Sequence, residues 1–223
     1  EWQAAISLQH IASFNFVYAN ADGDIHFIHN AMMPERAAGW RWDQYLPGNR
    51  RDLIWQRYLP TADLPSVTNP PSGYVHSANQ SPFRVSSTGS NPDQVNYPQE
   101  SGWPTRMTNR AVRGLELLDA NPAISFDDFN AIKHDNAYSP RYRGHAYLSL
   151  VANLEAIDDD EAQAIALIRE WDLHTDMANR HAALGVCVLL EEWQAERTGD
   201  SLPDARETLH KCMSSVRDVS GRL

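Results

Sequence analysis

The sequence has no run of 18 apolar residues, the length at which a transmembrane helix is predicted, and its first residues lack the basic-then-apolar pattern of a secretory signal. Positive charge is also scarce, since 19 Lys and Arg side chains stand against 29 Asp and Glu side chains, for a net charge of −10. Phosphate binding needs a basic surface, so we expect no nucleic-acid partner, and we expect no membrane partner.

Several catalytic and metal-binding signatures are missing as well. There is no phosphate-binding loop, no dinucleotide fingerprint and no G-x-S-x-G elbow, although the sequence leaves a Ser–His–Asp triad open. His26 and His29 are three residues apart on a predicted strand, where they would face opposite sides and diverge from a common metal. His174, Asp176 and His181 have no Cys partner at helical spacing, so we expect no zinc site.

Cysteine is nearly absent, and the two that occur, Cys187 and Cys212, both fall on apolar faces of predicted helices. They could pair or stay free. Buried free thiols are the commoner outcome for such positions, so we favour free thiols and draw no conclusion about the redox compartment.

The composition of the 223-residue sequence is ordinary for a globular domain, with 42% hydrophobic and 22% charged residues. Strands come first and helices follow, which predicts an α+β fold with helices packed on a sheet. An Asp22-Gly23 turn joins two alternating segments into a hairpin. Residues 34–67 form an aromatic-rich connector that we expect to pack. The predicted elements are a helix at 2–13, strands at 14–19, 25–31 and 73–78, and helices from 106 onward.

The segment from Asn69 to Pro82 is the most informative part of the sequence. Pro70, Pro71 and Gly73 mark a turn, a short extended run follows, and Asn79-Gln-Ser-Pro ends it. A carboxamide fixed at a strand end can aim an N–H at a developing oxyanion. In most turns, however, an Asn side chain bonds its own backbone, and turn chemistry alone favours that ordinary role for Asn79.

This segment resembles the penicillin acylase (penicillin amidase) family of N-terminal-nucleophile hydrolases, which carry Asn-Pro-x-Ser-Gly-Tyr followed by Asn-Asn-Ser-Pro. The resemblance continues in order along nearly the whole chain. Its further motifs are the Asn15–His29 hairpin, the Leu46-Pro-Gly and Tyr58-Leu-Pro60 connector, the Arg106–Leu118 and Ile124–Ile132 helices, and Trp171-Asp172. It implies an α+β fold that is part of a four-layer αββα sandwich.

The resemblance also implies site residues. Asn79 matches the side-chain donor of the family's oxyanion hole. Arg110 matches an Arg that supports this Asn, and counting back from the helix start at Ser125 favours Arg110 over its neighbours. Gln80 departs from the family's second Asn. No cofactor is required, but some members bind a structural calcium, for which Asp93 is the candidate here.

Finally, the resemblance implies an internal fragment, residues 1–223, of one large-subunit domain, with strands and packed loops at 1–105 and mainly helices at 106–223. The family's nucleophile is a Ser at the mature N-terminus of the large subunit, whereas residue 1 here is Glu. We therefore expect a periplasmic or secreted amide hydrolase for hydrophobic acyl groups, such as penicillins or acyl-homoserine lactones. Its expected partners are an amide substrate, the small subunit and the rest of the large subunit. The alternative is an inactive relative that serves as a binding or assembly module.

Overall fold

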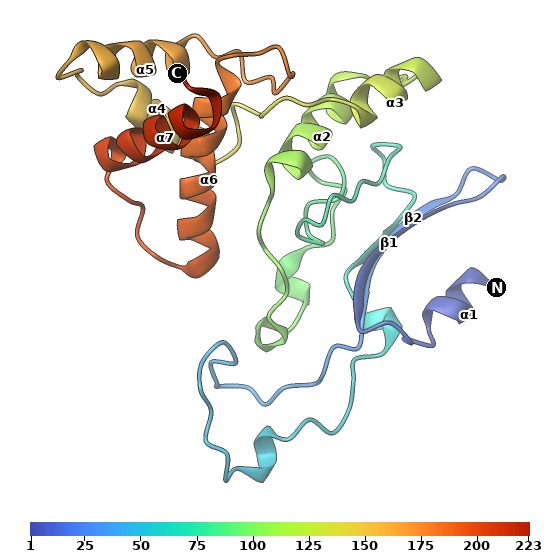
Figure 1. The fold of residues 1–223 in the computed structure, drawn as a ribbon. Helices are drawn as coiled ribbons and strands as arrows, with labels where there is room; N and C mark the ends of the chain where they lie inside the picture. The colour runs from blue at the N-terminus through green and yellow to red at the C-terminus, as the bar shows by residue number, and fades with distance from the viewer. The chain divides into compact units, whose positions relative to one another are not determined.

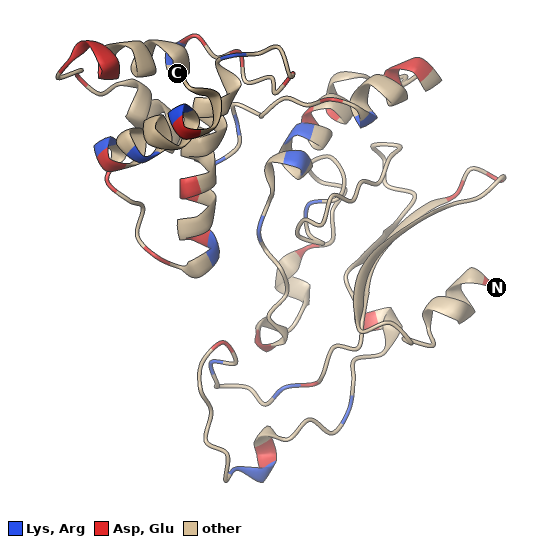
Figure 2. Ribbon diagram, in the orientation of Figure 1, with Lys and Arg blue, Asp and Glu red and all other residues tan.

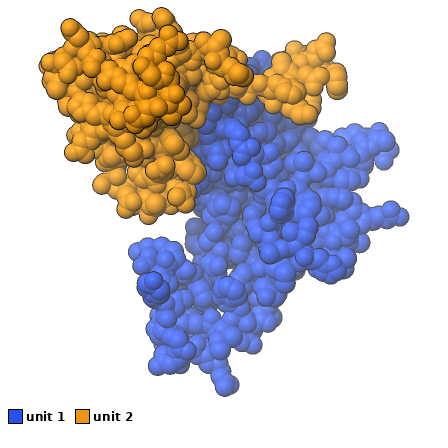
Figure 3. Space-filling view, viewed as in Figure 1, with its two compact units in different colours: residues 1–124 blue, residues 125–223 orange.

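The computed structural model describes residues 1–223, which form two compact units, Glu1–Ile124 and Ser125–Leu223 (Figure 3). The boundary differs from the division by secondary structure at residue 105, because the first long helix of the chain belongs to the strand-containing unit. The order of strands first and helices afterward is as expected.

The first unit is built on a three-stranded antiparallel sheet in the order β1-β2-β3 (Figure 1). The hairpin between β1 and β2 is confirmed, and Gly23 has the positive φ of 91° that the turn requires. The Asn20 side chain accepts the amides of Asp22 and Asp24 and closes the turn. The elements of this unit are α1 (Trp2–Ile6), β1 (Ser13–Ala19), β2 (Ile25–Ala31), β3 (Ser66–Thr68) and α2 (Asn109–Ala120), with 3-10 turns at Arg51–Leu53, Thr61–Asp63, Gln94–Asn96 and Gln99–Ser101.

The N-terminal helix is shorter than the sequence predicts. It ends at Ile6, because Gln9 adopts a left-handed φ of 48° and its side chain donates to the carbonyl oxygens of Ala31 and Leu59. Of the two Ile side chains expected on the buried side of a longer helix, Ile6 is buried and Ile11 is exposed. The hydrogen bonds of the Gln9 side chain to distant backbone thus outweigh the helical pattern of residues 2–13.

The predicted strand at 73–78 is also wrong. These residues join no ladder, and one backbone hydrogen bond, from the His76 amide to the Val85 carbonyl, links them to a neighbouring bend. Side chains hold this segment instead. The third strand of the sheet, β3, begins inside the stretch 34–67 that the sequence presents as connector.

The connector after β2 is packed at its base and exposed at its tip. Pro34 and Tyr58 form a bridge at its base, and the Arg36 guanidinium lies 5.4 Å from the Trp42 ring and 5.7 Å from the Trp55 ring. Tyr45, near the tip, is fully exposed. Figure 1 shows this excursion running away from the sheet, so the aromatic residues pack partly on one another.

The second unit is all helical, and polar side chains start most of its helices. Ser125 and Asp128 form the predicted capping box, while Asp158 and Asp204 accept backbone amides at the starts of the next capped helices. Figure 2 shows the acidic first turn of the helix that Asp158 caps. The helices are α3 (Phe126–Lys133), α4 (Gly144–Ala152), α5 (Asp159–Arg169), α6 (Ala182–Thr198) and α7 (Ala205–Ser220), and the core includes Tyr147, Val151, Ile165, Leu184, Val188 and Leu209.

The expectation of free thiols is wrong. Cys187 on α6 and Cys212 on α7 form a disulfide whose Cα atoms are 5.7 Å apart. Both residues lie on apolar helical faces, as predicted, but these two faces pack against each other and bring the sulfur atoms together. The pairing depends on a helix–helix contact that neither helix shows alone.

A buried carboxylate also ties α5 to α7. The Glu161 side chain is 1% exposed and is paired with Arg206 and His210, with the His210 Nε2 at 2.6 Å. One of its oxygens also accepts the Ile157 amide at 3.0 Å. Burial by itself would raise the pKa of Glu161, but these hydrogen bonds and the charge of Arg206 lower it from 4.5 to about 2.

We therefore expect acid to destabilise the second unit through Glu161. The folded pKa is depressed, so the contribution of Glu161 to stability is full above pH 4.5 and is lost as pH falls toward 2. Melting temperatures measured between pH 7 and pH 2 should fall less steeply in Glu161→Gln, from a lower starting value. Asp160→Asn is the matched control, because Asp160 pairs with Arg217 at the surface. A parallel acid profile for wild type and Glu161→Gln would contradict the prediction.

Reduction of the disulfide should also lower stability. The cross-link closes a 25-residue separation between α6 and α7, for which loop-closure entropy gives about 3 to 4 kcal/mol. Thermal melts of the Cys187→Ser/Cys212→Ser double variant, and of wild type with and without reductant, measure this loss. If reductant leaves the wild-type melt unchanged while free thiols are detected, the disulfide does not stabilise the fold.

Candidate active site

Asn79 occupies the apex of a tight turn. Its φ of 60° lies in the left-handed region, which Asn tolerates better than most residues with a side chain. The side chain is exposed and its carboxamide makes no hydrogen bond. The usual role of a turn Asn, bonding its own backbone, is therefore not the one seen here.

The neighbouring Gln80 holds the turn together. Its side chain is almost fully buried, at 2% exposure, and its oxygen accepts the Ala78 amide at 2.5 Å. Its nitrogen donates to the carbonyl oxygens of His76 at 2.9 Å and Arg84 at 3.1 Å. One carboxamide thus joins the residue before Asn79, the incoming segment and the outgoing segment. A buried polar group with so many partners fixes the backbone around it.

The segment that leads into this turn lies antiparallel along α2. The Tyr74 hydroxyl donates to the Asp119 carboxylate at 2.6 Å, near the end of the helix. At the opposite end, the Ser81 amide donates to the Arg106 carbonyl at 3.0 Å. The partner of Tyr74 lies near the end of α2 and the partner of Ser81 lies three residues before its start, so the segment runs antiparallel to α2 and packs beside it.

The sheet supports the turn through another contact. Asn15 on β1 donates from its side chain to the Gln80 carbonyl at 3.4 Å, and its oxygen lies 2.6 Å from Nδ1 of His29 on β2. His29 is buried against the edge of Trp103, and burial lowers its pKa. A neutral His29 can donate to Asn15, which fixes the orientation of the Asn15 carboxamide.

Arg110 lies on α2 in the same neighbourhood, but it does not touch Asn79 by a hydrogen bond. It is exposed and lies near His76, since its charge, after burial, is the second cause that lowers the pKa of His76. The structure thus brings the two predicted site residues, Asn79 and Arg110, to the segment and the helix that pack on each other. Their catalytic roles stay predictions.

The candidate metal ligands do not converge. His26 pairs with Thr68 at 2.6 Å while His29 pairs with Asn15, so the two rings diverge as predicted. No group of three or more His, Cys, Asp or Glu side chains is placed to hold a metal. Asp93 accepts the Val95 amide and caps a 3-10 turn. Calcium binding at Asp93 stays a prediction that gains no support from this contact.

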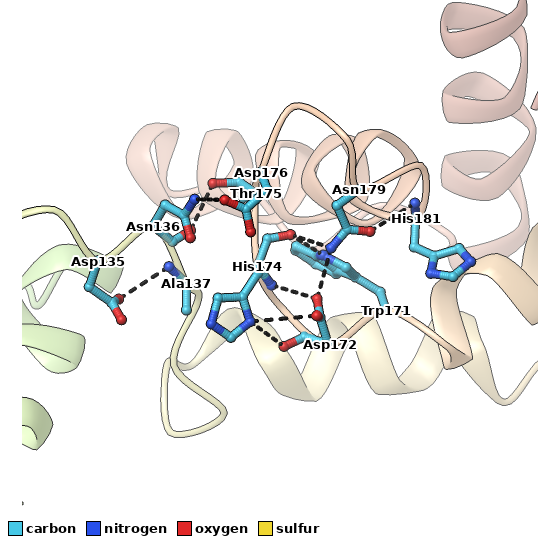
Figure 4. Close-up of polar contacts among 10 residues, drawn as sticks. All are labelled: Asp135, Asn136, Ala137, Trp171, Asp172, His174, Thr175, Asp176, Asn179 and His181. Carbon is cyan, nitrogen blue, oxygen red and sulfur yellow. Dashed lines mark hydrogen bonds and ion pairs between the residues drawn. The ribbon is translucent and has the colours of Figure 1, made fainter. Parts of the chain in front are cut away.

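The Trp171-Asp172 pair organises a loop in the second unit (Figure 4). The Trp171 indole donates to the His174 carbonyl at 2.7 Å, and the Asp172 carboxylate accepts the His174 amide and the Asn179 side chain. These bonds, the His174 amide first, lower the pKa of Asp172. His181 lies 3.7 Å from Glu170. The polar residues here serve separate loop contacts rather than one reaction centre.

The residues that sequence reasoning missed are the supports of Asn79, chiefly Gln80, Asn15 and His76. From the sequence, Gln80 is notable only as a departure from the family motif, and Asn15 only as the start of a hairpin. The sequence did contain one indication of His76, namely Gly114 inside a predicted helix. A glycine at such a position can allow another part of the chain to pack closely against the helix. The identity of the approaching side chain is a matter of tertiary structure.

Comparison with known proteins places this chain among the penicillin acylases. The model of the penicillin amidase family matches residues 1–218. The chain is 30% identical over 173 residues to a penicillin acylase 2 proenzyme from Pseudomonas sp. (strain SE83), covering 76% of this chain and 20% of that protein. It is 33% identical over 82 residues to a penicillin G acylase from Escherichia coli, covering 37% of this chain and 10% of that protein.

Among solved structures, a thermostable penicillin G acylase from Alcaligenes faecalis matches 99% of this chain and 49% of that chain, with a TM-score of 0.58 and 17% identity. This likeness confirms the fold class, part of an N-terminal-nucleophile hydrolase fold. No helix of the structure is both long and apolar enough to cross a membrane. The chain spans from a tenth to a fifth of these curated relatives and half of the solved one. By the family match over nearly its whole length, the chain belongs to the penicillin amidase family.

Proposed function

We propose that residues 1–223 are a section of an amide hydrolase in which the Asn79 carboxamide donates to the oxyanion of the tetrahedral intermediate. The observation that carries this proposal is an unpaired carboxamide held at the apex of a turn whose flanking residues are locked by Gln80. A donor that is fixed before the reaction costs no reorganisation when charge develops on the substrate oxygen.

The reaction needs a nucleophile, which we place outside these residues as the family resemblance implies. A Ser hydroxyl attacks the amide carbon and passes its proton to a base, the C–N bond breaks with the proton delivered to the leaving amine, and water then hydrolyses the acyl-enzyme. Asn79 stabilises the oxyanion in both steps. Arg110 contributes positive charge beside the segment that carries Asn79.

The substrates that we propose are amides of hydrophobic acids. The names of two curated relatives and one solved structure, all penicillin acylases, support penicillins as one substrate class. Acyl-homoserine lactones are a second class within the same chemistry. The catalytically inactive alternative is supported by no contact in the structure, whereas the unpaired Asn79 carboxamide favours the enzyme.

We also propose that the active protein is made by processing of a longer precursor, with a small subunit and the rest of a large subunit as partners. The word proenzyme in the name of one relative supports this assembly. A periplasmic or secreted location fits the Cys187–Cys212 disulfide, because disulfides persist mainly in oxidising compartments.

In the complete enzyme, Asn79→Ala should lower kcat by about 10²- to 10³-fold while the melting temperature stays close to that of wild type. The side chain is exposed and unpaired, so its loss removes no contact, and the left-handed φ of 60° costs the Ala variant about 1 to 2 kcal/mol, a small change for a large enzyme. KM should change less than kcat, because the donor acts mainly once charge develops. Steady-state kinetics on one chromogenic acyl amide, with a thermal melt, measure both quantities.

Asn121→Ala is the matched control for this prediction, since the Asn121 oxygen accepts the Ala123 amide in an ordinary turn contact at 3.1 Å. Turnover should be unchanged in this control. A kcat for Asn79→Ala within about threefold of the parent value would mean that Asn79 is a turn residue without a catalytic role.

Residues 1–223 expressed alone should not hydrolyse acyl amides, because the proposed nucleophile lies outside them. The measurement is release of chromophore from a phenylacetyl and a long-chain acyl amide, compared with the complete enzyme at equal concentration. Turnover by purified residues 1–223 that survives repurification and is lost in Asn79→Ala would place the nucleophile within this chain instead.

A further inference from the structure

His76 is wedged between the Asn79 segment and α2. The imidazole lies directly over Gly114, where an added Cβ atom would sit 2.5 Å from the His76 Nε2 and 2.9 Å from its Cε1. Real Cβ atoms do not approach other atoms so closely, so any other residue at position 114 would have to displace the ring. The helix therefore carries a notch for this side chain.

The other side of the His76 ring faces Gln80. The Gln80 nitrogen is 3.2 Å from the His76 Nδ1 and 2.9 Å from the carbonyl oxygen of the same residue. Nδ1 must be unprotonated to accept this bond, which requires the neutral ring with its proton on Nε2. Burial, and then the charge of Arg110, lower the pKa of His76 and favour this neutral form.

We propose that His76, seated on Gly114 and bonded to Gln80, is a positioning residue that sets the place of the Asn79 carboxamide relative to α2. The inference rests on the proposed oxyanion role of Asn79. Gln80 carries the position of His76 to the Asn79 turn, because the same carboxamide holds the His76 carbonyl and the Ala78 amide. If the ring moves away from α2, the turn moves with it.

The position of His76 also sets how far the Asn79 turn lies from the charge of Arg110. Arg110 lies one helical turn before Gly114, on the same face of α2. Seating His76 on Gly114 therefore brings the Asn79 turn to a defined distance from the Arg110 charge. Misplacement of a catalytic group by about 1 Å can cost as much as 10²-fold in rate, so a small displacement at position 114 should be visible in turnover.

A double-mutant cycle between His76 and Gly114 in the complete enzyme tests this inference. Gly114→Ala should lower kcat by about 10- to 100-fold with KM within about threefold, because its new methyl group displaces the ring. His76→Ala should lower kcat by a similar factor. In the His76→Ala background, the added Gly114→Ala change should cost less than about twofold, since no ring remains to be displaced.

The effect of Gly114→Ala on the melting temperature should also depend on His76, and it should change sign when His76 is removed. Ala is the better helix former, so Gly114→Ala should raise the melting temperature when His76 is absent and lower it when His76 is present. This pattern also covers the case in which Gly114→Ala alone fails to fold, because the double variant should then fold. Gly48→Ala is the control, since a Cβ at Gly48 meets nothing within 4 Å; it should change neither quantity.

The protonation state of the His76 ring provides a measurement that is independent of turnover. In nitrogen NMR of the wild type, the His76 Nδ1 should report an unprotonated acceptor, and its signal should shift in both Gly114→Ala and Gln80→Ala. A purely structural side chain would affect stability without a selective loss of kcat. His76→Gln, whose side-chain oxygen can accept from Gln80, should recover part of the turnover lost in His76→Ala.

The outcomes separate the two proposals. If Asn79→Ala loses turnover while Gly114→Ala and His76→Ala retain it, the positioning inference is wrong and the proposed function stands. If Gly114→Ala costs the same with and without His76, the two residues are not coupled and the inference is equally wrong. If Asn79→Ala keeps full turnover, the proposed function fails, and with it the inference.

Discussion

The buried carboxamide of Gln80 is the interaction on which the candidate site depends. It is 2% exposed, and it joins the amide before Asn79 to two carbonyl oxygens on either side of the turn. Removing such a group would leave several backbone atoms buried without partners, at a cost of about 1 to 3 kcal/mol each. Gln80 thereby fixes the backbone from which the Asn79 side chain projects.

The same arrangement explains how an irregular segment can be rigid. Residues 73–78 belong to no ladder. The segment is nevertheless fastened to α2 through Tyr74, to the residues just before α2 through Ser81, and to the sheet through Asn15. Loops that present functional groups on a rigid scaffold commonly work in this way. The scaffold here is a helix on one side and a two-stranded hairpin on the other, both within residues 1–124.

Features that depend on local sequence were predictable, and those that depend on distant contacts were not. The Asp22-Gly23 turn and the Ser125 capping box each depend on a few adjacent residues, and both are confirmed. The family resemblance also led to the correct fold class. The Cys187–Cys212 disulfide depends on the packing of two helices, and the early end of α1 depends on Gln9 reaching two distant carbonyl groups. No pattern within either segment contains that information.

Gln80 shows why a motif can mislead about the residues that matter. Its departure from the family's second Asn counts against the resemblance when the motif is compared letter by letter. In the structure, the longer side chain reaches backbone on both sides of the turn and also the His76 ring. An Asn would be shorter by one carbon–carbon bond, about 1.5 Å, and could not keep the same set of partners without moving the backbone. The ring in turn requires a residue without a Cβ at position 114. Three positions that are unremarkable one by one, His76, Gln80 and Gly114, are therefore constrained by one another, and together they hold Asn79 in place.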